Sequence, residues 1–204
     1  METLQMKIDE NLKELRGTKM QSHLSITCLQ QTSRQLTPQQ EKEFRTFMLN
    51  NSPAVQSDFA QSPVNCLFGS YPSMQELRSH YGKNAPIVWL IPQLKDLSEF
   101  CGVKDKMLNE QLQSCAKVIA TEFGYLKTSE LMLFFHLFKA GRYGQFYGAV
   151  DPMKITTSLR TFLVDRNDYF WRLEQRKKEK ERDEWKKGAV TYEKYQELVK
   201  EGKV

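Results

Sequence analysis

The sequence has no apolar run long enough to cross a bilayer. Its longest apolar stretch, residues 131–138, is far shorter than the roughly 20 residues that a membrane-spanning helix needs. The first ten residues carry acidic side chains early and lack an apolar segment, which argues against a secretory signal peptide. We therefore expect a cytoplasmic protein that does not associate with a membrane.

Cysteine and histidine are scarce and widely spaced. The four cysteines, Cys28, Cys66, Cys101 and Cys115, form no CxxC pair. Four cysteines would form only a sparse disulfide framework in a chain of this length. We therefore expect reduced and mostly buried thiols. The three histidines offer no closely spaced ligands for zinc, and the sequence predicts no metal site.

Recognisable catalytic motifs are also absent. No carboxylate pair, Ser–His–Asp set or Cys–His set has useful local spacing, although a triad can be assembled from distant residues. The glycine-rich segment 141–148 lacks the lysine and the preceding strand of a nucleotide-binding loop. The sequence therefore predicts a protein that is not an enzyme, with no catalytic residues and no cofactor. An enzyme with a spatially assembled site is a minor alternative.

The residues that are present favour a folded core and an uneven charge. Apolar residues make up 40% of the 204 residues and charged residues 27%, which excludes wholesale disorder. Residues 1–102 hold 10 basic and 10 acidic side chains, whereas residues 103–204 hold 20 and 15. Between Lys139 and Lys187 there are 13 basic and 8 acidic residues, so this segment accounts for the net charge of +5. Such a segment suits nucleic acid or another anionic partner.

The hydrophobic periodicity predicts a mainly α fold. Thr37, Pro38 and Gln40 form a helix start with a capping box. Residues 24–29 alternate apolar and polar side chains, as in a short strand or an extended arm. Ile87–Ile91, between two prolines, is a short buried segment whose type stays open. Other helical patterns cover residues 3–16, 73–80, 94–101, 108–119 and 128–140.

We predict an irregular helical domain with a long, charged C-terminal helix. Residues 1–50 would form an N-terminal helical arm region. Residues 51–72, rich in Asn, Ser and Pro, would form a loop-rich hinge. Residues 73–173 would form the helical core, and residues 174–204 a charged helix and tail.

The long helix begins at Asp151 and Pro152, which suit the cap and the first helical position. No Gly or Pro interrupts the following stretch up to Lys187, so the helix would span about 35 residues, or about 52 Å at ~1.5 Å per residue. Its second half is charged on all sides. We favour a solvated helix, because charge runs usually lie in solvent. The alternative is an arm for a nucleic-acid backbone that uses Arg166, Arg172, Arg176, Lys177 and Lys178.

Segment 141–148 combines three glycines with Arg142, Tyr143, Phe146 and Tyr147. We favour a tight reversal between two helices, with the three aromatic rings packed across the turn. In the alternative, the arginine and the rings form a presented patch that stacks on exposed bases or fits a protein groove. Lys139 and Lys154 would then add charge.

One stretch, residues 125–166, carries a resemblance to known proteins. The sequence pattern that carries it consists of Tyr125-Leu126-Lys127, then Phe138-Lys139-Ala140-Gly141-Arg142-Tyr143-Gly144, Phe146-Tyr147-Gly148, Asp151-Pro152 and Arg166. It resembles a small uncharacterised family found on bacteriophages and on conjugative or integrative elements. More distantly, it resembles the helical domain of non-ATPase phage replication accessory proteins such as helicase loaders.

The resemblance implies a mobile-element accessory factor that acts in DNA replication or element maintenance. Its expected partners are single- or double-stranded DNA, a replicative helicase or another replication protein. The alternative is a phage-type structural protein, or an inhibitor that binds a host protein, without contact to nucleic acid.

Overall fold

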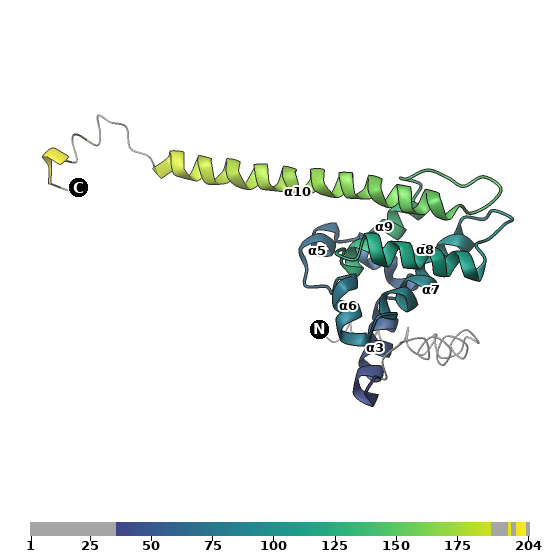
Figure 1. The fold of residues 1–204 in the computed structure, drawn as a ribbon. Coiled ribbons are helices and arrows are strands. Elements are labelled where there is room, and N and C mark those ends of the chain that lie inside the picture. The colour runs from purple at the N-terminus through teal and green to yellow at the C-terminus, as the bar shows by residue number, and fades with distance from the viewer. Residues whose placement is uncertain (1–35, 189–195, 197–198, 203–204) are drawn as a thin grey trace, which may run out of the picture. The chain divides into compact units, whose positions relative to one another are not determined.

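The structure is a computed structural model that describes residues 36–188, 196 and 199–202 (Figure 1). The predicted helix at residues 3–16 and the strand or arm at 24–29 lie outside the described residues. The chain divides into two compact units, one up to Leu159 and one from Arg160 onward. The predicted core boundary at residue 173 differs from this division, because no described side chain beyond Phe162 is buried.

The described residues form eight α-helices, one short 3-10 helix and no strand, so the mainly α prediction is confirmed. The elements are α3 (Pro38–Asn50), η2 (Pro53–Val55), α4 (Gln56–Ala60), α5 (Pro63–Phe68), α6 (Met74–Tyr81), α7 (Ala85–Phe100), α8 (Asn109–Glu122), α9 (Thr128–Lys139) and α10 (Pro152–Gly188).

The prediction of a loop-rich hinge at residues 51–72 is wrong, because η2, α4 and α5 occupy most of it. Pro53 and Pro63 lie in the first turn of these helices, where the missing N–H has no intrahelical acceptor to lose. α4 and α5 pack against α9, and Cys66 and Leu67 of α5 are buried. This segment is therefore part of the core.

Helix α3 also belongs to the first unit, which corrects the prediction of an arm for its residues. Phe44 is buried and packs with Ala85 and Val88 at the start of α7. Its ring centroid lies 5.0 Å from that of Tyr81. One large aromatic side chain thus joins α3 to α6 and α7.

The segment between Pro86 and Pro92 is the first part of α7, which continues past Pro92 to Phe100. Proline inside a helix removes one backbone hydrogen bond and costs about 3 kcal/mol. Here the surrounding side chains Trp89, Leu90 and Leu94 are all fully buried. Their packing offsets the cost and keeps the helix continuous.

Helix starts follow the local sequence in two cases and depart from it in a third. The Gln40 N–H donates to Thr37 Oγ1 (3.3 Å), and the Thr37 N–H donates to Gln40 Oε1 (3.1 Å), which confirms the capping box. Ser73 and Glu76 form a second box at α6, and its hydrogen bonds lower the pKa of Glu76. At α9 Lys127 occupies the cap position, and Thr128 is the first helical residue, with a buried hydroxyl that has no hydrogen-bond partner.

Helix α9 is buried on all sides rather than along one stripe. Leu131–Phe135 are all buried, with exposures of 4% or less. The helix packs against α4, α5 and α7, as expected of a helix that is apolar all round.

The first turn of α9 is hydrogen-bonded to the end of α5 and the segment after it. Ser129 Oγ donates to the Cys66 carbonyl at 2.7 Å. Lys127 Nζ donates to the carbonyls of Leu67 (3.0 Å) and Gly69 (2.9 Å). The two side chains thus bind carbonyls at the C-terminal end of α5, where the last carbonyls of a helix have no intrahelical partner.

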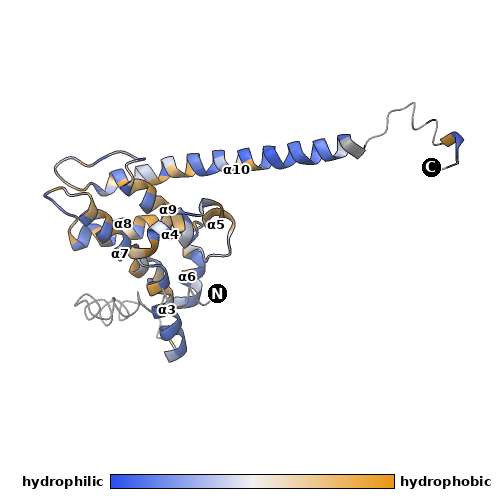
Figure 2. Cartoon of the chain, turned by 180° about the vertical axis from the view of Figure 1, so that it is seen from behind, coloured by the Kyte–Doolittle hydropathy of each residue, from blue (hydrophilic) through white to orange (hydrophobic). Residues whose placement is uncertain are grey.

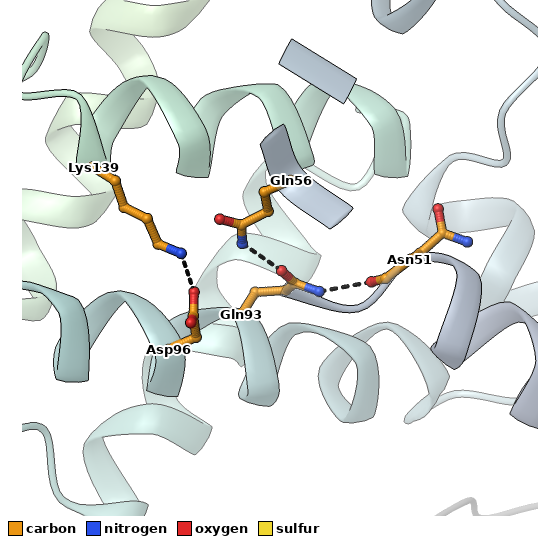
Figure 3. Close-up of polar contacts among 5 residues, drawn as sticks. All are labelled: Asn51, Gln56, Gln93, Asp96 and Lys139. Atoms are coloured by element: carbon orange, nitrogen blue, oxygen red, sulfur yellow. Dashed lines mark hydrogen bonds and ion pairs between the residues drawn. The ribbon is translucent and has the colours of Figure 1, made fainter. Parts of the chain in front are cut away.

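A buried amide network joins the end of α3 and the start of α4 to α7 (Figure 3). The Asn51 carbonyl accepts hydrogen bonds from Trp89 Nε1 (2.9 Å) and Gln93 Nε2 (2.8 Å). Gln93 Oε1 accepts a third from Gln56 Nε2 (2.7 Å). Asn51, Gln56 and Gln93 are all buried, so each lost bond would leave a polar group without water or partner.

We expect Gln93→Leu to lower the free energy of unfolding by about 1–3 kcal/mol, because the buried Gln56 amide loses its acceptor. Urea denaturation followed by circular dichroism measures the change. Gln113→Leu, at an exposed position of α8, is the matched control and should change stability by less than about 0.5 kcal/mol. Equal stability of the two variants would contradict a structural role for the network.

We expect a chain that ends at Arg166 to keep the melting temperature of the full chain to within about 5 °C, because no described side chain beyond Phe162 is buried. Thermal unfolding of both chains tests this. A drop of 10 °C or more, on the order of 3 kcal/mol, would contradict this expectation and show that residues after Arg166 stabilise the fold.

Candidate functional site

The sequence predicted a tight reversal after α9, whereas the structure has a longer connection, residues 140–151, whose glycines take positive φ angles. Gly144 has φ +92° and Gly148 has φ +74°, in the left-handed region that favours glycine. Backbone geometry therefore explains these two glycines without any bound phosphate.

The three aromatic residues of this turn divide into two packed rings and one exposed ring. Phe146 is 9% exposed, and its ring stacks on Phe138 with centroids 5.4 Å apart. The Tyr143 ring lies 5.7 Å from that of Phe134. Tyr147, by contrast, is 85% exposed. The predicted packing is correct for Tyr143 and Phe146 and wrong for Tyr147, which points out from the turn.

The sequence predicted that Lys139 and Lys154 add charge to the aromatic turn. In the structure both side chains bind other residues of the protein. Lys139 forms an ion pair with Asp96 of α7 (Figure 3). Its Nζ also lies 5.5 Å from the centroid of Phe100. The Lys154 ammonium donates to the Gln145 carbonyl and lies over the ring of Phe146. Both lysines thus hold elements together.

Backbone and side-chain hydrogen bonds hold the C-terminal end of the turn. The Asp105 N–H donates to the Gly148 carbonyl (3.3 Å), and the Val150 N–H donates to the Asp105 carbonyl (3.0 Å). The Met153 N–H donates to Asp151 Oδ1 (2.8 Å), which confirms that Asp151 caps α10. What the turn presents at the surface is Arg142, Tyr147 and Met153, all exposed.

The second unit contains α10 from Arg160 onward. Every residue from Glu174 to Lys186 is exposed, and Figure 2 shows that hydrophilic residues cover most of the later turns. The prediction of a helix without interruption from Met153 to Lys187 is confirmed.

The five predicted site residues on α10 have different environments. Arg166 is half-buried, with its guanidinium 4.8 Å from the centroid of Phe170. Lys178 pairs with Glu174 at 2.9 Å, and Lys177 approaches Glu181 at 3.9 Å. Arg172 and Arg176 are exposed.

The positive charge lies mainly in this exposed helix. Residues 160–187 contain 10 basic and 7 acidic side chains, a net charge of +3. Residues 36–159 contain 12 basic and 11 acidic side chains, a net charge of +1. The described part of the first unit is therefore close to neutral.

Sequence reasoning missed the two tryptophans of α10. Trp171 is 62% exposed and Trp185 is 74% exposed. A signal was available, because Val164, Trp171 and Trp185 are separated by multiples of seven residues. That spacing places them close to one line along a helix.

Two of the described cysteines, Cys66 and Cys115, are buried thiols. Burial raises the pKa of Cys66 to about 11 and that of Cys115 to about 12, so both thiols are protonated at neutral pH and are poor nucleophiles. Within residues 36–188, 196 and 199–202, no group of three or more His, Cys, Asp or Glu side chains could hold a metal ion. None of the helices in this part of the chain is long and apolar enough to cross a membrane.

Residues 106–204 match a family of unknown function (DUF6633). The matched stretch includes α8, α9, the glycine turn and α10, whereas α3–α7 precede it. No curated protein and no solved structure matches the chain. The glycine turn and the exposed part of α10 therefore both lie in the part of the chain that is similar to this family.

The adjacent residues Phe146 and Tyr147 offer a matched test of the turn. We expect Phe146→Ala to lower the free energy of unfolding by about 3 kcal/mol, because a buried ring is lost. Tyr147→Ala should change it by less than about 0.5 kcal/mol, because the ring is exposed. Urea denaturation of the two variants measures both values, and similar losses would show that Tyr147 packs as well.

Proposed function

We propose that the protein is a non-enzymatic accessory factor that binds nucleic acid through residues 160–187 of α10. The observation that carries this proposal is the net charge of +3 on a helical segment in which every residue from Glu174 to Lys186 is exposed. Lys and Arg side chains on such a segment can neutralise phosphates and release their counterions.

The charges on this segment have two separable roles. Glu174–Lys178 and Lys177–Glu181 are i,i+4 pairs, which stabilise a helix that receives little support from packing. Arg172, Arg176 and Lys180 are exposed. The arginine guanidinium presents several donors in a plane, which suits phosphate oxygens.

A role in DNA replication or element maintenance rests on the resemblance of residues 125–166 to mobile-element proteins. Under this proposal the turn contacts a protein partner, such as a replicative helicase, through Arg142 and Tyr147. Both residues are exposed, and Arg and Tyr are enriched where protein interfaces derive most of their affinity. The same two residues would serve the alternative function, an inhibitor that binds a host protein without nucleic acid.

The test of nucleic-acid binding is the salt dependence of affinity for a fluorescently labelled 20-nucleotide strand and the matching duplex. We expect the triple variant Arg172→Gln, Arg176→Gln and Lys180→Gln to bind both at least about tenfold more weakly near 0.1 M salt. The slope of log K against log salt should fall by roughly 2–3, because each phosphate contact contributes about 0.7–0.9.

The control removes the same charge from the first unit, where Lys83, Lys104 and Lys117 are all exposed. Changing these three to Gln should leave the affinity within about threefold, because they lie outside the basic helix. Equal losses in the two triple variants would indicate attraction by net charge alone. Absence of salt-sensitive binding in the parent chain would exclude the nucleic-acid function and favour the protein-only alternative.

A further inference from the structure

One side of α10 carries a stripe of eight residues without a carboxylate. Its members follow at intervals of three or four residues, so they lie along one face of a helix with 3.6 residues per turn. All eight are exposed. The stripe consists of Arg160, Val164, Asn167, Trp171, Gln175, Lys178, Arg182 and Trp185.

The absence of acidic residues from this stripe contrasts with the rest of the helix. Seven carboxylates occur between residues 160 and 187, and all of them lie at positions outside the stripe. Glu174 borders it and pairs with Lys178 at 2.9 Å. Three cations and no carboxylate therefore point along this line, which suits an anionic ligand.

The two tryptophans require an explanation of their own. They are 62% and 74% exposed, although indole rings are usually well buried. A solvated helix needs only polar side chains to stay soluble, so charge patterning does not account for these rings. They are 14 residues apart, or about 21 Å at ~1.5 Å per residue, and Lys178 and Arg182 lie between them.

We propose that this tryptophan-basic stripe binds single-stranded nucleic acid. Bases stack on Trp171 and Trp185, while Lys178 and Arg182 contact the intervening phosphates. A separation of about 21 Å corresponds to about six nucleotides at ~3.4 Å each. The proposal rests on the nucleic-acid function above and names the form of its ligand and the face that binds it. Arg172, Arg176 and Lys180 lie outside the stripe, on the other side of the helix, where they add to the attraction of phosphates.

The stripe should bind single-stranded nucleic acid more tightly than a duplex, because only unpaired bases have free faces. In a duplex both faces of a base are covered by neighbouring pairs, so an indole ring cannot stack without opening the helix. Unpaired bases have free faces, and stacking on an aromatic side chain contributes about 1–3 kcal/mol per base. The phosphate contacts of α10 serve both forms, whereas the tryptophans favour the single strand.

The composition of the stripe argues against two other occupants, a parallel second copy of the helix and a membrane surface. A parallel pair with a second copy of the helix would bring Arg160, Lys178 and Arg182 near their counterparts, with no carboxylate of the stripe to compensate. Insertion into a membrane surface needs a broad apolar face, whereas the stripe holds only three apolar residues, Val164 and the two tryptophans.

The experiment uses the full chain and compares two double variants at the same positions. Trp171→Leu with Trp185→Leu removes both aromatic planes but keeps apolar side chains. Trp171→Phe with Trp185→Phe keeps an aromatic ring at each position. The probe is a 20-nucleotide oligothymidine, with a 20-base-pair duplex as comparison and the salt concentration held constant.

We expect the leucine variant to bind oligothymidine at least about tenfold more weakly, with a change of less than about threefold for the duplex. The phenylalanine variant should retain most of the single-strand affinity. In the parent chain, oligothymidine should quench tryptophan fluorescence, and in the phenylalanine variant this quenching should disappear, because the remaining Trp89 is fully buried.

Three outcomes would overturn the proposal that the stripe binds single-stranded nucleic acid. The first is unchanged single-strand affinity in the leucine variant. The second is equal loss for strand and duplex, which would indicate a general effect on the helix. The third is self-association, detected by light scattering, that the leucine substitutions abolish while nucleic-acid affinity stays constant. In the first and third cases, a salt-dependent loss in the charge variant would still support the proposed function, so the two failures are distinguishable.

Discussion

The burial of α9 on all sides is the constraint on which the rest of the first unit depends. A helix without a polar face has to be enclosed, and α4, α5 and α7 enclose this one. The enclosure also buries its polar first turn, where Ser129 and Glu130 are fully buried. Those groups need hydrogen-bond partners, and the end of α5 provides the carbonyl of Cys66 for Ser129. The helices of residues 51–72 are therefore a consequence of the apolar composition of α9.

The same constraint shapes the glycine turn. The apolar surface of α9 continues to Phe138, and Phe146 returns to cover it. Lys154 then secures the returning segment, and Lys139 links α9 to α7. Much of the stretch from Phe138 to Pro152 is thus made of residues that build the helix, the turn and the next helix. A partner has to be inferred from exposed residues such as Arg142 and Tyr147.

Sequence reasoning succeeded where a structure is determined within a few residues. The capping box at Thr37 and the Asp151–Pro152 helix start both depend on local hydrogen bonds or backbone angles. Sequence reasoning failed where the local structure depends on packing against residues far away in the sequence. The helices of residues 51–72 and the passage of α7 through Pro92 depend on burial against other elements. The exposure of Tyr147 could not be read from its neighbours, since Phe146 beside it is buried.

The charge of the chain shows the same separation of local and distant effects. In the sequence, Lys139 to Lys187 is one basic segment with a net charge of +5. In the structure, Lys139 pairs with Asp96, and Lys154 at the start of α10 contacts the turn, so the available excess lies on the later part of α10. A helix with little packing needs oppositely charged neighbours for stability, which accounts for its acidic residues. Stability does not require that the carboxylates avoid one face, nor that two tryptophans occupy that face. The arrangement is instead what contact with unpaired bases and phosphates would require.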